Sequence, residues 1–261
     1  MSAFAVEISL PLKWRGSAYL ARLSPRSIRY FTEGMMVNSV DMLSIRLVRN
    51  HDIVLFARST IWTGMGYQYE DIVFDPRDMH YSLAPGLRSQ IGRFNLSFLW
   101  YHDCFHEVDR NEEPTTIWNI YELRFSPITY IADARRENIR KMGKPYFAFL
   151  NNLNWEIAWG IFPRFKSIFW FQYTHPFTNR FEADLRLSLV QYAAATVEFR
   201  YQPTVWMELG GNSSQRQYIE LALAYYSKNS AMSMFWGYTM KETQPIRPKD
   251  GLTWFGFRWE L

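Results

Sequence analysis

The chain lacks any apolar run long enough for a membrane-spanning helix. Such a helix needs about 18 or more consecutive apolar residues. The longest apolar clusters, such as Ile168-Phe169-Trp170-Phe171, are interrupted at once by polar residues. The sequence therefore excludes a helical membrane protein.

The chain also has few cysteines and no block of charges of one sign. Cys104 is the single cysteine, which excludes an intramolecular disulfide framework and a multi-cysteine metal site. The 29 basic and 25 acidic residues are scattered along the chain, with a net charge of +4 and no basic block. Nucleic-acid-binding proteins concentrate their basic residues, so we expect no nucleic-acid partner.

Aromatic residues and period-two alternation are abundant instead. The 11 Trp, 16 Tyr and 20 Phe make 18% of the chain, which is more than ordinary soluble domains carry. Successive side chains of a strand point to opposite faces, so alternation predicts strands with one apolar and one polar face. In residues 4–14 one face holds Phe4, Val6, Ile8, Leu10, Leu12 and Trp14. The pattern returns in residues 181–189, 218–226 and 251–261.

A soluble sandwich also alternates, but the details favour a membrane barrel. The polar face of a sandwich carries many lysines, whereas here it carries arginines and carboxylates. Trp and Tyr recur at strand ends, as in the aromatic girdles of membrane barrels, and segments of about ten residues suit a tilted membrane strand. We therefore predict an all-β fold: one closed antiparallel transmembrane β-barrel of twelve to fourteen strands over residues 1–261, in the bacterial outer membrane. We expect these residues to face the lipid: Phe4, Val6, Leu185, Leu187, Phe255 and Phe257.

Turn signals give a first set of strand positions. The predicted strands are 3–14, 40–50, 53–63, 80–91, 94–106, 115–127, 144–150, 153–163, 167–176, 181–190, 193–203, 215–227, 231–240 and 251–261. These are fourteen, an even number that places both termini on the periplasmic side. If residues 144–163 form one strand, twelve strands become the natural alternative. The predicted external loops are 15–39, 64–79, 107–114, 204–214 and 241–250, and residues 128–143 could hold a short periplasmic helix.

The inward face is expected to carry charges of both signs. Its predicted members are Glu7, Lys13, Arg46, Arg88, Asp103, Glu122, Arg124, Glu156, Glu182, Asp184, Arg186, Glu198, Arg200, Glu208, Glu220, Arg258 and Glu260. Such balance favours pairing across the lumen over a selectivity ring of one sign. We predict an obstructed lumen with Arg–carboxylate pairs that include Arg124, Arg186 and Arg200.

The beginning of the sequence shows no export signal. Residues 1–6 lack a charged region followed by an apolar core and a cleavage site. Because an exported barrel needs such a signal, we interpret the sequence as a mature form with an added start Met.

One group of polar residues is a candidate functional site. In the predicted strand 94–106, His102 and Cys104 share the outward face with the apolar residues that precede them. Asn119 has the same outward parity on the next strand. Polar groups turned toward lipid are costly and call for a function.

At these positions the sequence resembles outer-membrane phospholipase A. That family carries a His-x-Ser pair on one strand and a Trp-Asn step on the next, and here His102-Asp103-Cys104 and Trp118-Asn119 occupy these places. The resemblance implies a lipid hydrolase or acyl transferase with His102 as general base, Cys104 in place of the Ser nucleophile, and Asn119 orienting the imidazole. It also implies calcium as a cofactor, for which carboxylates lie nearby at Glu107, Asp109, Glu112 and Glu113.

Other interpretations of the same residues stay open at this stage. His102 and Asn119 could be headgroup-level polar residues of a barrel that serves as a structural anchor or as a subunit of an envelope complex. His102, Cys104 and His106 could instead be three zinc ligands on one face. The expected partners are membrane lipids and, in the anchor interpretation, other envelope proteins. A transport function would need a continuous lumen, which the charge pairing argues against.

Overall fold

The computed structural model describes residues 7–25, 30–48, 51–66, 75–108, 115–130, 153–163, 177–244, 246 and 249–261. Its strands are β1 Glu7–Ser9, β2 Lys13–Ser24, β3 Thr32–Val48, β4 His51–Gly66, β5 Asp75–Ile91, β6 Phe94–Glu107, β7 Thr116–Pro127, β8 Leu153–Ile161, β9 Phe177–Tyr192, β10 Ala195–Glu208, β11 Ser213–Tyr226, β12 Ala231–Glu242 and β13 Thr253–Glu260. Among these described residues, no helix is long and apolar enough to cross a membrane.

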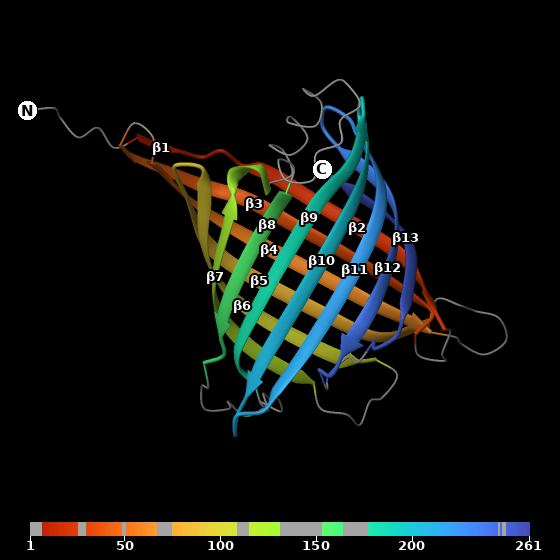
Figure 1. The fold of residues 1–261 in the computed structure, drawn as a ribbon. Coiled ribbons are helices and arrows are strands. Elements are labelled where there is room, and N and C mark those ends of the chain that lie inside the picture. Colours follow the sequence, from red (N-terminus) through yellow and green to blue (C-terminus); the bar gives the residue numbers. More distant parts are fainter. Residues whose placement is uncertain are drawn as a thin grey trace, which may run out of the picture.

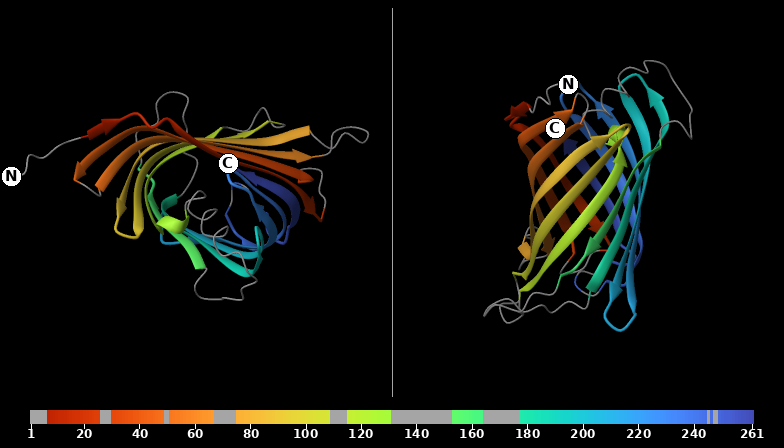
Figure 2. Two further views of the ribbon diagram at one scale, coloured as in Figure 1. Left: turned by 90° about the horizontal axis from the view of Figure 1, so that it is seen from above. Right: turned by 90° about the vertical axis from the view of Figure 1, so that its left-hand side faces the viewer.

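Strands β2 to β13 form a closed antiparallel ring of twelve. Each pairs with its neighbours along the chain, and β2 also pairs with β13, which closes the ring. Glu260 lies opposite Ser17 in that closing ladder. The short β1 pairs only with the end of β3, at Glu7 and Arg46 among others. Figures 1 and 2 show the tilted strands surrounding a central space. The predicted barrel is confirmed, with twelve strands.

The count of fourteen is wrong, because β8 pairs directly with β7 and with β9 and the ring has no further strand on either side of it. Two other segments were misassigned without an effect on the count. Residues 15–39, predicted as an external loop, contain most of β2 and the start of β3. The predicted strand 3–14 is instead the short β1, a break at residues 10–12, and the start of β2. Alternation is hidden in β2 because its lumen face is apolar too: Ala21 and Leu23 pack with Tyr218, Phe235 and Trp254.

The other boundaries differ mainly in strand length. Strands β4, β5, β10 and β12 extend into the predicted loops 64–79, 204–214 and 241–250. The predicted strands 144–150 and 167–176 lie outside the described residues. Of the helix predicted in residues 128–143, a 3-10 turn at Ile128–Tyr130 is described and the rest lies outside the described residues.

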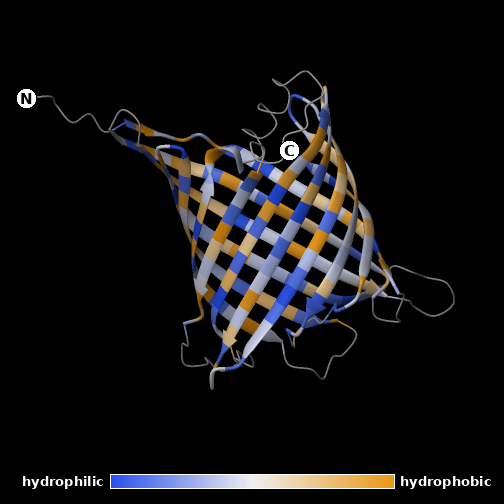
Figure 3. Cartoon of the chain, viewed as in Figure 1, coloured by the Kyte–Doolittle hydropathy of each residue, from blue (hydrophilic) through white to orange (hydrophobic). Residues whose placement is uncertain are grey.

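The two faces of the wall divide by polarity, as Figure 3 shows along the strands. Phe255 and Phe257 are 49% and 61% exposed on the outer face, whereas Asp184 and Glu220 are each 3% exposed on the inner one. Leu185 and Leu187 alternate with the inward Asp184 and therefore face outward. Phe4 and Val6 lie outside the described residues.

Ion pairs fill much of the lumen. Arg124 contacts Glu122 and Glu156, and Arg186 and Arg200 both contact Asp184. The predicted participation of these three arginines is confirmed. Cavities of about 490 Å³ and 240 Å³ lie between the lumen-facing side chains of the described residues. Eight residues line both of them: Ser17, Val37, Arg58, Arg124, Tyr130, Glu156, Arg186 and Glu260.

The lengths of the connections orient the barrel. At the end where β2 begins and β13 finishes, three hairpins turn within two residues and a fourth within four, while β7 and β8 have a longer connection. The opposite end carries longer connections, such as residues 108–115 between β6 and β7. Barrels of the bacterial outer membrane place short turns in the periplasm and longer loops outside. We call the two ends the periplasmic end and the outer end.

Candidate functional site

Strands β6 and β7 place the predicted residues on one patch of the outer wall. His102 lies directly opposite Asn119 in the ladder, and Cys104 lies opposite Ile117. Their neighbours on β6, including Phe98 and Trp100, are exposed on the outer face. Alternation therefore turns His102, Cys104 and Asn119 toward the lipid, as the sequence predicts.

The depth of this patch follows from strand geometry. At a rise of about 3.4 Å per residue and a tilt of about 40°, each residue adds about 2.6 Å of height. Cys104 is ten residues beyond Phe94, where β6 begins at the periplasmic end, or about 26 Å higher. The apolar band of such barrels is about 25 Å tall. With the start of β6 taken as the inner edge of this band, Cys104 lies near its outer margin, where ester groups of lipids are found.

The three side chains form one hydrogen-bonded chain. Nδ1 of His102 lies 3.1 Å from Oδ1 of Asn119, and Nε2 lies 3.3 Å from Sγ of Cys104. An amide oxygen only accepts hydrogen bonds, so Nδ1 of His102 carries the ring proton and donates a hydrogen bond to Oδ1 of Asn119. Nε2 then presents a lone pair to the thiol. This tautomer is the one in which an imidazole can take a proton from sulfur.

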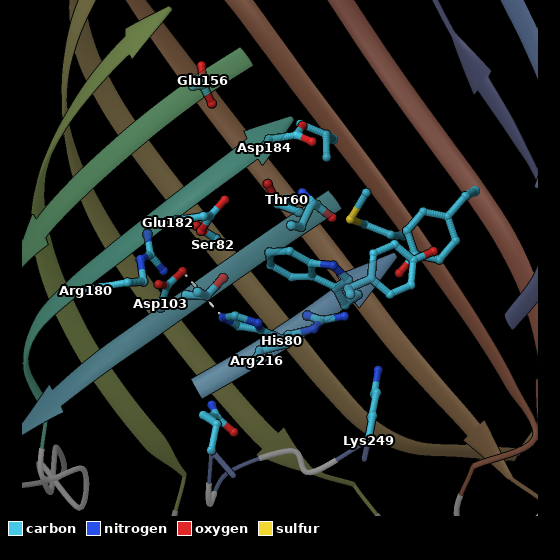
Figure 4. Close-up of a pocket in the computed structure, with 18 of the residues that line it drawn as sticks. Thr60, His80, Ser82, Asp103, Glu156, Arg180, Glu182, Asp184, Arg216 and Lys249 are labelled. Carbon is cyan, nitrogen blue, oxygen red and sulfur yellow. Dashed lines mark ion pairs between the residues drawn. The ribbon is translucent and has the colours of Figure 1, made fainter. Parts of the chain in front are cut away.

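The lumen side of the same strands is also hydrogen-bonded. Nε1 of Trp118 donates to Oδ2 of Asp103 at 2.8 Å, and both residues are buried. Nε2 of His80 on β5 lies 3.4 Å from the other oxygen of Asp103, while its ring stacks on Trp62 at 4.4 Å. Figure 4 shows His80, Ser82 and Asp103 converging inside the barrel. These contacts tie β5, β6 and β7 together directly behind the outward patch.

A second histidine lies on the outward face of β6. Nδ1 of His106 is 3.1 Å from Oγ1 of Thr115, and its ring meets Tyr81 edge to face at 5.9 Å. From the sequence, His106 is expected only as one of three zinc ligands in one interpretation, and neither Thr115 nor Tyr81 is predicted as its neighbour. The outward parity of Tyr81 was available as a signal, whereas its place beside Cys104 depends on the register between β5 and β6.

The described residues do not fit a metal site at this patch. Among them, no group of three or more His, Cys, Asp or Glu side chains is close enough to hold an ion. Calcium takes six to eight oxygen ligands, and the residues paired with Cys104 in the ladders are Tyr81 and Ile117. Glu107 belongs to the lumen-facing set of β6, and Asp109, Glu112 and Glu113 lie outside the described residues.

Comparison with known proteins shows likeness in fold. No protein-family profile and no curated protein sequence matches the chain. The solved structure of outer-membrane phospholipase A from Escherichia coli is similar, with 12% identity, a TM-score of 0.52 and 95% of each chain covered. The dimeric outer-membrane phospholipase of Salmonella typhi with bound calcium has 12% identity and a TM-score of 0.54, over 95% of this chain and 90% of that one.

At 12% identity this likeness shows the fold alone. The chain is a β-barrel of the bacterial outer membrane with the architecture of outer-membrane phospholipase A. The predicted localisation and the predicted resemblance in fold are confirmed.

Proposed function

We propose that this barrel is a lipid acyl hydrolase or acyl transferase of the phospholipase A type. The observation that carries the proposal is the hydrogen-bonded chain from Asn119 through His102 to Cys104 on the lipid-facing wall. A nucleophile, a base within reach and a group that orients the base are the three parts that covalent acyl transfer requires. A height near the outer margin of the apolar band supports a phospholipid ester as the bond that the thiol attacks.

The reaction begins with proton transfer from Cys104 to His102. Nε2 takes the thiol proton while the sulfur attacks the ester carbonyl carbon. The ester C–O bond then breaks, and the proton passes from Nε2 to the departing alkoxide oxygen. The products of this half are a lysophospholipid and an acyl thioester on Cys104.

The second half-reaction regenerates the free enzyme by hydrolysis of the thioester. His102 takes a proton from water, whose oxygen attacks the thioester carbonyl and forms the bond to the acyl group. The C–S bond breaks and the sulfur regains the proton from Nε2, which releases a fatty acid. An alcohol in place of water gives acyl transfer. Throughout, Asn119 accepts from Nδ1 and stabilises the protonated ring. No step is assigned to calcium, because the described residues do not form a site for it.

Thiol chemistry supplies a direct test, because Cys104 is the single cysteine. Purified protein in detergent with calcium should release fatty acid from phospholipid vesicles or micelles. A thiol-alkylating reagent should abolish this turnover in the parent protein. Cys104→Ser should retain or raise turnover and be insensitive to the reagent, while Cys104→Ala should be inactive yet folded. Met234→Ala, at an exposed position of β12, is the control for a truncation on the outer wall.

Two outcomes would contradict the proposal. Unchanged turnover in Cys104→Ala would exclude Cys104 as the nucleophile. If the parent protein releases no fatty acid at all, the barrel would instead be a non-catalytic anchor or subunit of an envelope complex.

A further inference from the structure

His106 has a defined place on the outer wall that the proposed reaction leaves unused. It lies two residues beyond Cys104 on β6 and shares its outward face. Oγ1 of Thr115 holds one side of the ring at 3.1 Å, and Tyr81 packs against it at 5.9 Å with the rings nearly perpendicular. A ring fixed by two neighbours is ready to bind without further loss of side-chain entropy.

The height of His106 corresponds to the lipid headgroups. Two residues of a tilted strand raise it by about 5 Å above Cys104. Because Cys104 is at the outer margin of the apolar band, His106 lies outside that band, in the interfacial layer. In a glycerophospholipid the phosphate is only a few bonds from the ester carbonyl, on the side toward water. A lipid whose ester reaches Cys104 therefore brings its phosphate to the level of His106.

The chemistry of the ring suits a phosphate oxygen. The Thr115 hydroxyl can donate to Nδ1, which leaves the proton on Nε2. Nε2–H is then a donor that points away from Thr115. Hydrogen bonds to phosphate oxygens are charge-assisted and stronger than neutral ones. His102 has the reverse arrangement, because an amide oxygen fixes its proton on Nδ1. The two histidines are thus prepared for different tasks, one as base and one as donor.

We propose that His106, oriented by Thr115 and Tyr81, binds the phosphodiester headgroup of the substrate lipid. This inference rests on the proposed function and specifies its substrate class: phosphate-bearing lipids are preferred over neutral esters. His106 contacts the substrate away from the reacting atoms, so its effect is on binding and specificity. Thr115 acts through His106 as a positioning residue.

Competition between substrates tests this preference. With a phospholipid and a diacylglycerol of the same acyl chains, His106→Gln should lower kcat/KM for the phospholipid about tenfold more than for the diacylglycerol, mainly through KM. Thr115→Val should shift the preference in the same direction, and Thr115→Ser should restore it because a hydroxyl returns. An equal loss for both substrates in His106→Gln would overturn the inference, since it would indicate a purely structural contribution. An unchanged preference would overturn it as well.

A binding measurement separates this inference from the proposed function. In the Cys104→Ala background no thioester can form, so lipid retention can be counted by native mass spectrometry from detergent. The protein should retain more phosphatidylglycerol than diacylglycerol. Adding His106→Gln should lower the ratio of the two retained lipids by about tenfold. Equal retention of both lipids in the presence of His106 would refute the headgroup site even if turnover exists. Displacement of the phospholipid by millimolar inorganic phosphate would reassign the site to a soluble anion and overturn the lipid assignment.

Discussion

The indole nitrogen of Trp118 lies 2.8 Å from Oδ2 of Asp103, on the lumen side of the two strands whose outer side carries the candidate site. Asp103 stands between His102 and Cys104, and Trp118 precedes Asn119 in the chain. The two residues face each other in the same ladder as His102 and Asn119. A shift of β6 against β7 would therefore change two contacts together: the hydrogen bond between Trp118 and Asp103 on the lumen side, and the contact between His102 and Asn119 on the outer side.

Loss of the indole donor should reduce activity more than stability alone explains. Trp118→Phe keeps a ring but leaves Asp103 without its 2.8 Å donor, at a cost of about 1–3 kcal/mol. We expect a drop in turnover and a slower alkylation of Cys104. Trp254→Phe is the matched control, because Nε1 of Trp254 donates to Thr239 at 3.0 Å between β12 and β13. Equal effects of the two variants on Cys104 alkylation would contradict a positioning contribution from Trp118.

Asn119 should affect kcat rather than substrate binding. Asn119→Ala removes the acceptor that holds the Nδ1 proton of His102, so the ring can rotate and adopt the other tautomer. We expect kcat to fall by about 10-fold to 100-fold, less than the 10²–10⁴ attributed to a general base itself. KM should change little. Initial-rate kinetics on a phospholipid measure both constants, and a rise in KM at constant kcat would speak against an orienting contribution.

A buried carboxylate of the lumen should matter far more for stability than an exposed one. Asp184 accepts from Arg200 at 2.7 Å and 2.8 Å and from Arg186 at 3.1 Å, so Asp184→Ala leaves two partly buried guanidinium groups without this carboxylate partner. We expect a loss of about 3–5 kcal/mol in the free energy of unfolding. Asp52→Ala, which removes the exposed pair with Arg46, should cost about 0–1 kcal/mol. Urea unfolding in lipid vesicles, followed by tryptophan fluorescence, measures both; similar values would contradict this assignment.

The barrel should conduct ions poorly. The side chains shared by the two cavities, including Arg124, Glu156 and Arg186, form a charged layer across the lumen. Planar-bilayer recordings of the parent protein should show no large, stable conductance. Replacing Arg124 and Arg186 together by serine should raise the conductance, because the layer loses two of its three arginine side chains. A large conductance in the parent would mean that the lumen is a pore.

For most strands, the order of residues is enough to predict which face of the wall each side chain occupies. Side chains alternate with a period of two, so the outward parity of Phe255 and Phe257 and the inward parity of Asp184 follow from the order of residues alone. The same rule put His102, Cys104 and Asn119 on the outer wall. It failed for β2, because Ala21 and Leu23 are apolar on the lumen side, where they pack against Tyr218 and Trp254. Local alternation cannot distinguish such a strand from a loop.

Only the tertiary structure decided the register and the closure. The pairing of His102 with Asn119 depends on how β7 is aligned after the connection at residues 108–115, and one residue of slip would turn Asn119 inward. Twelve strands rather than fourteen follow from the direct pairing of β8 with β7 and with β9. The ladder between β2 and β13, which closes the ring, joins residues more than two hundred positions apart. Contacts between strands that are closer in the chain, such as the hydrogen bond between His106 and Thr115 and the packing of Tyr81 on His106, also depend on how the strands are aligned. The local sequence around each residue does not predict these contacts.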